Sequence, residues 1–246
     1  MNQNLLLPAS GRAGAWLRDQ ALPFWLDRGL DPLGMAWEEM SFDGVPRETG
    51  YRRTLVQFRQ VYVFAHAAQA GWCPPGRAAS LFFATCARAR HRDGGFVHRL
   101  SPAGDSLDDT RDAYDQAFAL LAAGWIFRLT GDSRALDIAH ETLDFMQREM
   151  AHPEGGFVEA LPPRTPRRQN PHMHLFEALL VLFEASRDVA FIDAARRILS
   201  LFAEANSSPP AGPCLSISAM TGPRSKRASS PAIISNGSGC SMNSSA

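Results

Sequence analysis

DGGFVHRL (93–100) and EGGFVEAL (154–161) are two copies of one motif, and a weaker third copy reads LGMAW (33–37). When Gly34 is aligned with Gly95 and Gly156, the motif returns at intervals of 61 and 61 residues. A Gly-Gly-Phe sequence followed by Val-x-x-Leu predicts a tight turn that leads into a short extended segment. Repetition at a fixed period of this size indicates stacked supersecondary units.

Each copy of the motif is followed by two segments whose apolar residues recur at the three- and four-residue spacing of helices. The first segment of each pair is apolar almost all round and is expected to be buried on most sides, whereas the second is amphipathic. The expected helices span residues 53–70, 77–91, 110–130, 133–151, 171–186 and 189–205.

Helix pairs of this kind cover their apolar faces only by stacking side by side. The closed arrangement of such pairs is an (α/α)6 toroid, with an inner ring of buried helices and an outer ring of amphipathic ones. A full ring needs roughly six pairs, and this sequence supplies about three. The sequence therefore predicts an all-α fold, a partial (α/α)6 toroid over residues 1–206.

The composition narrows the class of protein. The chain has 246 residues, of which 45% are apolar, and its 25 basic and 25 acidic residues balance. This balance argues against a nucleic-acid binder. We expect no membrane span, because no run of 18 apolar residues occurs, and the N-terminus does not resemble a signal peptide. Four cysteines without metal-ligand spacing agree with a cytoplasmic protein that holds no metal. The sequence leaves the formation of a homodimer open.

The C-terminal segment differs abruptly from the rest. Residues 207–246 contain 12 serines and no acidic or aromatic residue, whereas residues 1–206 hold all 25 acidic residues. Such a segment cannot bury enough apolar surface to offset its ordering entropy, so we expect a disordered tail. A shift of reading frame also explains the change, because the codons of residues 231–237, read in another frame, can spell Gly-His-His-Phe-Glu-Trp.

Polar side chains on the apolar first helices are candidates for chemistry, because the N-terminal ends of inner helices in a toroid converge on one mouth. Plain structural roles remain open for each, such as an ion pair, a core aromatic or a helix cap. A spacing of three residues within the last helix suits either an oriented histidine or half of a metal site, but no second ligand pair is visible. The candidates are Arg59, Tyr114, Asp115, Asn170, His174 and Glu177.

LVQFRQVYVFAHA (55–67), DAYDQAFALLA (112–122), the GGF turns and QNPHMHLFEA (169–178) resemble the N-acylglucosamine 2-epimerase family, which includes mannose isomerases and cellobiose 2-epimerases. The resemblance covers about residues 15–206 and implies an (α/α)6 toroid. It also implies a cofactor-free epimerase or isomerase of small sugars, in which histidines transfer a proton next to the carbonyl through an enediolate.

The resemblance assigns roles to the candidates. It implies that His174 is a catalytic histidine, that Arg59 is the cation facing the oxyanion, and that Glu177 orients its surroundings. Tyr114 and Asn170 are implied to bind sugar hydroxyls, and we place Asp115 and Glu177 with the substrate-binding residues. The family carries two further catalytic histidines in its later half, one of them in a Gly-His-x-x-Glu-Trp pattern. The chain as translated has neither, so we expect a truncated or frameshifted member with impaired activity.

Three other functions remain open from the sequence. A sugar-phosphate isomerase would use Arg164, Arg167 and Arg168 for the phosphate. A glycoside hydrolase on the same toroid needs two opposed carboxylates, for which Asp115 and Glu177 are the candidates. A protein-binding module would use the exposed helical wall.

Overall fold

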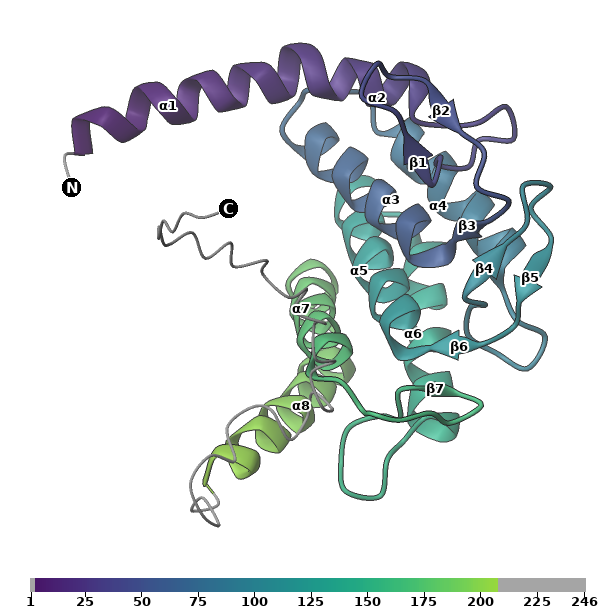
Figure 1. Ribbon diagram of the computed structural model, residues 1–246. Coiled ribbons are helices and arrows are strands. Elements are labelled where there is room, and N and C mark those ends of the chain that lie inside the picture. The colour runs from purple at the N-terminus through teal and green to yellow at the C-terminus, as the bar shows by residue number, and fades with distance from the viewer. Residues whose placement is uncertain (1–2, 208–246) are drawn as a thin grey trace, which may run out of the picture.

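The computed structural model describes residues 3–207 of the chain, and these form an open arc of helix pairs (Figure 1). Three inner helices lie side by side, with α5 in contact with both of its neighbours. An outer helix follows each inner helix in sequence and packs against it. The inner helices are α3 (Thr54–Gln69), α5 (Ala113–Thr130) and α7 (Gln169–Ser186), and the outer ones are α4 (Gly76–Ala89), α6 (Ser133–Glu149) and α8 (Val189–Ser207).

The predicted all-α fold, a partial toroid of about three helix pairs, is confirmed by this arrangement. The sequence predicts disorder for residues 207–246; Ser207 is the last residue of α8, and residues 208–246 lie outside the described residues. Within residues 3–207, no helix combines the length and the apolar character that crossing a membrane would require.

A helical segment precedes the first repeat and was not predicted. It consists of α1 (Gln3–Trp16), the π-helical turn η1 (Leu17–Ala21) and α2 (Leu22–Arg28). Figure 1 shows α1 extending away from the helix pairs. A mainly apolar pocket of about 480 Å³, lined in part by Trp16 and Tyr62, lies between this segment and α3.

Short antiparallel strands connect the repeats at the N-terminal ends of the inner helices. Pairing of β3 with β4 and of β6 with β7 joins the strand before an inner helix to the strand of the following repeat. The mouth of the arc is therefore held together by backbone hydrogen bonds. The strands are β1 (Glu39–Met40), β2 (Pro46–Arg47), β3 (Arg52–Arg53), β4 (Arg99–Leu100), β5 (Ser106–Asp108), β6 (Arg111–Asp112) and β7 (Ala160–Leu161).

The glycine turns repeat as predicted, but the first copy is shifted by one residue. The amides of Gly34, Gly94 and Gly155 each donate to the carbonyl three residues earlier, so these three glycines are equivalent. The repeat therefore measures 60 and then 61 residues, and the predicted alignment of Gly34 with Gly95 was wrong. Residues at equivalent positions must be read in this corrected register.

The fourth residue of each inner helix fixes this register. Gln57 accepts from the amide of Ala36 at 2.7 Å and donates to its carbonyl at 2.9 Å. Gln116 does the same to Phe96, at 2.9 Å in both directions. In the third repeat the buried His172 takes this place, and its Nε2 accepts from the amide of a phenylalanine at 3.0 Å. These buried side chains thus clamp each turn to its helix.

Candidate functional site

The sixth residue of each inner helix lies at the same level, and these residues are Arg59, Phe118 and His174. The Arg59 guanidinium carbon lies 5.5 Å from the centre of the Phe118 ring. The His174 ring lies 4.9 Å from the same ring and 5.3 Å from the ring of Tyr114, the second residue of α5. We call these four side chains the Phe118 cluster. The structure therefore brings Arg59, Tyr114 and His174 together, with Phe118 between them.

The imidazole of His174 is oriented by a carboxylate. Its Nδ1 lies 3.0 Å from Oε2 of Glu177, one helical turn further along α7. A carboxylate oxygen accepts hydrogen bonds, so Nδ1 is the donor in this contact and Nε2 is the ring nitrogen that Glu177 does not bind. His174 is partly exposed, and Glu177 is exposed. The role of Glu177 in orienting its surroundings stays a prediction, and the group that it contacts is the ring of His174.

Arg59 is an exposed cation, and no carboxylate within the described residues forms an ion pair with it. Its contact with the face of Phe118 is a cation–π interaction. The alternative that Arg59 is a member of a structural ion pair therefore does not hold in this part of the chain. The charge of Arg59 is free to face an anion.

Asn170 is not the N-cap of α7, because the N-cap is Arg168 and Asn170 lies inside the first turn. Asn170 is exposed and is the second residue of its helix, the place that Tyr114 has in α5. A neutral amide and a phenol thus occupy equivalent positions at the mouth.

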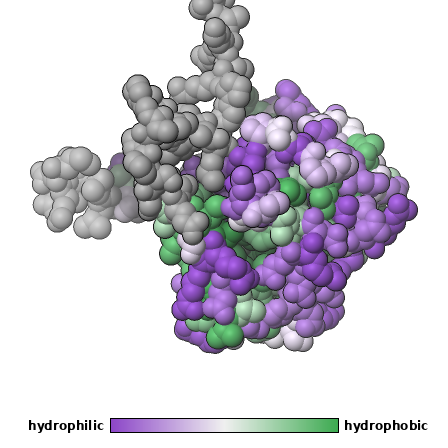
Figure 2. Space-filling model, turned by 90° about the horizontal axis from the view of Figure 1, so that it is seen from below, coloured by the Kyte–Doolittle hydropathy of each residue, from purple (hydrophilic) through white to green (hydrophobic). Residues whose placement is uncertain are grey.

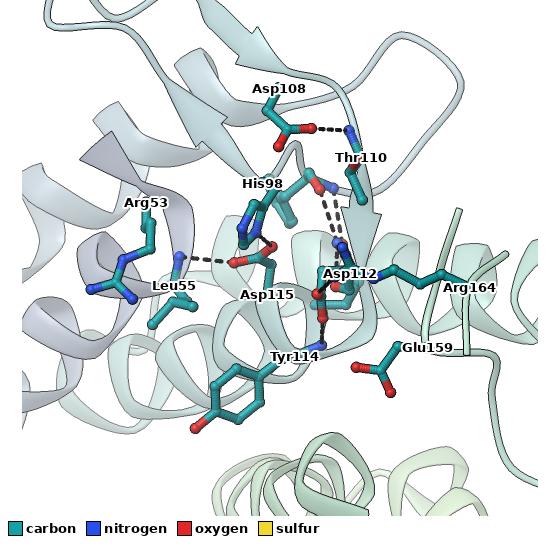
Figure 3. Close-up of polar contacts among 12 residues, drawn as sticks. Arg53, Leu55, His98, Asp108, Thr110, Asp112, Tyr114, Asp115, Glu159 and Arg164 are labelled. Atoms are coloured by element: carbon teal, nitrogen blue, oxygen red, sulfur yellow. Dashed lines mark hydrogen bonds and ion pairs between the residues drawn. The ribbon is translucent and has the colours of Figure 1, made fainter. Parts of the chain in front are cut away.

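The placement of Asp115 corrects its predicted role as a substrate-binding residue. Its side chain is fully buried, and both of its oxygens are bonded within the protein (Figure 3). One oxygen accepts from the amide of Leu55 at 3.1 Å, and the other lies 2.7 Å from Nδ1 of His98. Burial raises the pKa of Asp115 to about 7. This carboxylate has no free face to present to a sugar.

His98 was missed as a candidate because it lies in the repeated turn. In the corrected register it is equivalent to Glu38 and Glu159, which each bind the arginine before an inner helix, Arg53 and Arg168 respectively. At this position of the repeat, the first and third copies carry a glutamate and the second carries a histidine. This difference is the signal that could have identified His98. The hydrogen bond to Asp115 raises the pKa of His98.

Arginines of the basic loop before α7 form internal ion pairs, and Figure 3 shows Arg164 reaching Asp112. Arg164 pairs with the buried Asp112, and Arg168 pairs with Glu159 and lies 3.7 Å from Asp112. Arg167 donates to a backbone carbonyl at 2.6 Å. Two of the three arginines are therefore neutralised by carboxylates.

No group of three or more potential ligands that could hold a metal ion occurs within the described residues. His174 and Glu177 contact each other without a second pair of such side chains nearby.

Comparison with known proteins decides the family. The sequence model of the N-acylglucosamine 2-epimerase family matches residues 36–209. The chain belongs to this family. A mannose-6-phosphate isomerase of Rhizobium meliloti (strain 1021) is 38% identical over 203 residues, which cover 78% of this chain and 50% of that protein. A D-mannose isomerase of Marinomonas mediterranea is 26% identical, over 72% of this chain and 47% of that protein.

Solved structures of a cellobiose 2-epimerase and of a D-mannose isomerase share the fold. Cellobiose 2-epimerase from Spirochaeta thermophila aligns with a TM-score of 0.72 at 22% identity, over 81% of this chain and 54% of that one. A D-mannose isomerase structure aligns with a TM-score of 0.68 at 23% identity, over 77% of this chain and 50% of that one. The chain thus spans about half the length of the epimerase-family relatives that it matches.

Proposed function

We propose that this member of the N-acylglucosamine 2-epimerase family forms one wall of a sugar isomerase or epimerase site. The observation that carries the proposal is the Phe118 cluster. It joins an imidazole with a free Nε2 to a guanidinium that has no carboxylate partner within the described residues. Proton transfer next to a carbonyl needs such a base and such a cation.

His174 is proposed as the base. Its Nε2 takes the proton from C2 of the open-chain sugar, and the electron pair of the C–H bond forms the enediolate. Glu177, on Nδ1, stabilises the imidazolium that results. Return of the proton to C2 from the opposite face gives the epimer, and return to C1 gives the ketose.

The other residues of the Phe118 cluster, together with Asn170, bind the sugar in this proposal. Arg59 faces the oxygen that becomes negative in the enediolate, where a fixed cation stabilises the transition state. Tyr114 and Asn170 offer hydrogen bonds to hydroxyl groups from the second positions of their helices. Phe118 packs against a C–H face of the sugar. Asp115 supports the site from behind instead of touching the sugar.

We further propose that the chain by itself turns sugars over slowly. At the second and sixth positions of α3, α5 and α7, His174 is the single histidine. Delivery of a proton to the opposite face of C2 requires a second group on the other side of the sugar. This wall alone is therefore suited to removing the C2 proton and returning one to the same face.

The proposal is tested by incubating the chain with mannose in D₂O and following deuterium at C2 by NMR. We expect slow exchange above the buffer background, with little fructose or glucose formed. His174→Asn should abolish the exchange. His140→Asn is the matched control, because His140 lies on α6 and pairs with Asp188. Exchange at the background rate in the wild type, or at an equal rate in His174→Asn, refutes the proposal, and robust fructose formation refutes the slow turnover.

A sugar phosphate is a second candidate substrate class, and the name of the Rhizobium meliloti relative favours it. The ion pairs of Arg164 and Arg168 count against it, because a phosphate would have to displace Asp112 and Glu159. We expect mannose to exchange faster than mannose 6-phosphate in the same D₂O assay. A preference for the phosphorylated sugar that disappears in Arg167→Ala would reverse the choice.

The two remaining alternatives have less support. A glycoside hydrolase would need Asp115 as one of its two carboxylates, and that side chain is fully buried. A protein-binding module would use exposed apolar surface. Figure 2 shows apolar side chains among the polar ones on the face in view. Val63 and Met173 are among the exposed apolar residues. Retention of a protein partner by the His174→Ala variant would favour a binding module.

A further inference from the structure

His98 and Asp115 form a hydrogen-bonded pair between the N-terminal ends of α3 and α5 (Figure 3). The Asp115 side chain is fully buried, and the His98 side chain is 16% exposed. In the close-up His98 lies on one side of the Asp115 carboxylate, and the ring of Tyr114 points away from the pair. The proposed proton transfer uses neither residue, so the pair needs another explanation.

The first two amides of α3 are bonded to this pair. The Thr54 amide donates to the backbone carbonyl of His98 at 3.0 Å, and the Leu55 amide donates to the Asp115 carboxylate at 3.1 Å. The residue before them, Arg53, is the N-cap of α3 and makes no cap bond with its side chain. The start of α3 is therefore capped by residues of the next repeat.

α5 provides the contrast. Its own N-cap, Asp112, accepts from the amide of Tyr114 at 2.8 Å, which is the usual arrangement within one helix. Asp115, one residue after Tyr114, is therefore not needed to cap its own helix and accepts a hydrogen bond from the first turn of α3. The carboxylate bridges a helix that carries Arg59 and a helix that carries Phe118.

We propose that His98 and Asp115 are positioning residues for the sugar site, which fasten the first turn of α3 to α5 and so set the place of Arg59 against Phe118. The inference rests on the proposed function only in assuming that the site binds a sugar. The effect of the pair on the position of Arg59 is structural and does not depend on the substrate. Arg59 lies five residues after Thr54, so a displacement of the first turn of α3 moves its guanidinium, now 5.5 Å from the Phe118 ring.

The surroundings of the pair favour a charged hydrogen bond. The hydrogen bond to Asp115 raises the pKa of the imidazole, and the charges of Asp112 in β6 and Asp108 in β5 add to this effect. On the α3 side, the nearby Arg53 is already bound to Glu38. When the imidazole is protonated and Asp115 is ionised, the bond between them is charge-assisted, and such a bond is roughly twice as strong as a neutral one.

The test compares Asp115→Ala, which removes both bonds, with Asp115→Asn, whose amide can still accept from Leu55. Asp109→Ala is the matched control, because it removes a nearby exposed carboxylate that accepts a hydrogen bond from Ser106 and does not contact the pair. The first readout is the Nε–Hε NMR signal of Arg59 in the full chain without sugar. We expect this signal to shift in Asp115→Ala, to return toward its wild-type position in Asp115→Asn, and to stay unchanged in the control.

The second readout is the mannose concentration for half-maximal C2 exchange. We expect it to rise about tenfold in Asp115→Ala, equivalent to ~1.4 kcal/mol, and to recover in Asp115→Asn. If Asp115→Ala does not fold, His98→Ala replaces it, because that variant keeps the backbone carbonyl that binds Thr54. An unshifted Arg59 signal in a folded Ala variant overturns the inference. A shifted signal in a chain that exchanges no sugar protons supports the positioning role and refutes the proposed function.

Discussion

Replacement of Gln116 by alanine should destabilise the chain strongly, because its side chain clamps the second glycine turn to α5. The side chain is fully buried and binds both the amide and the carbonyl of Phe96, each at 2.9 Å. Gln116→Ala leaves two buried backbone groups unpaired, and each such group costs about 1–3 kcal/mol. We therefore expect a loss of about 3–5 kcal/mol in the free energy of unfolding.

Urea unfolding followed by circular dichroism measures this loss, with the midpoint and slope fitted together. Gln147→Ala on the exposed face of α6 is the matched control and should change the free energy by less than about 0.5 kcal/mol. Gln116→His should restore part of the stability, because His172 performs the equivalent task in the third repeat. A Gln116→Ala variant as stable as the Gln147→Ala control would refute the assignment of the clamp.

Three further outcomes are expected, all measured by chemical denaturation. Gly95→Ala should cost ~3 kcal/mol or more, since a Cβ at φ +72° would lie 2.4 Å from the buried Phe145 ring, whereas Gly131→Ala, at φ +69° with open space, should cost only about 1–2 kcal/mol. His172→Gln should be tolerated and His172→Ala should not, and equal losses would contradict the equivalence of the clamps. Burial raises the pKa of Asp115 from 3.8 to about 7, so the folded state holds the proton of Asp115 more tightly than the unfolded state. The contribution of this group to the free energy of unfolding should therefore fall as the pH rises from 3.8 to about 7. The difference in that free energy between wild type and Asp115→Asn should change over this pH range, and a difference independent of pH would contradict the raised pKa.

Much of the fold follows from the sequence because the inner helices are apolar on nearly all faces and the turns repeat. The same contrast identifies Arg59 and His174, since a polar side chain on such an apolar helix stands out. The helical segment before residue 30 was missed because α1 carries a proline and two glycines and has no clear apolar stripe. Its helical character could not be inferred from periodicity.

Two of the errors at the site, on Asp115 and His98, arise because the roles of these residues depend on partners distant in sequence. Asp115 is a polar residue on an apolar helix like the others, but its partner amide belongs to Leu55, 60 residues earlier. Phe118 was overlooked because an aromatic residue on an inner helix looks like core. His98 could be recognised only after the hydrogen bonds of the turns had corrected the alignment of the repeats by one residue. In the corrected alignment His98 is equivalent to two glutamates.

The bonds from Thr54 to His98 and from Ala113 to Glu159 both run from the start of an inner helix to the following repeat. Within residues 3–207, a cut at the sequence period would therefore leave α3 or α5 without the acceptor that the following repeat provides. Engineers who wish to shuffle or transplant these units should move the boundary past the next glycine turn. Measured unfolding should then proceed in overlapping blocks that are longer than the period read from the sequence.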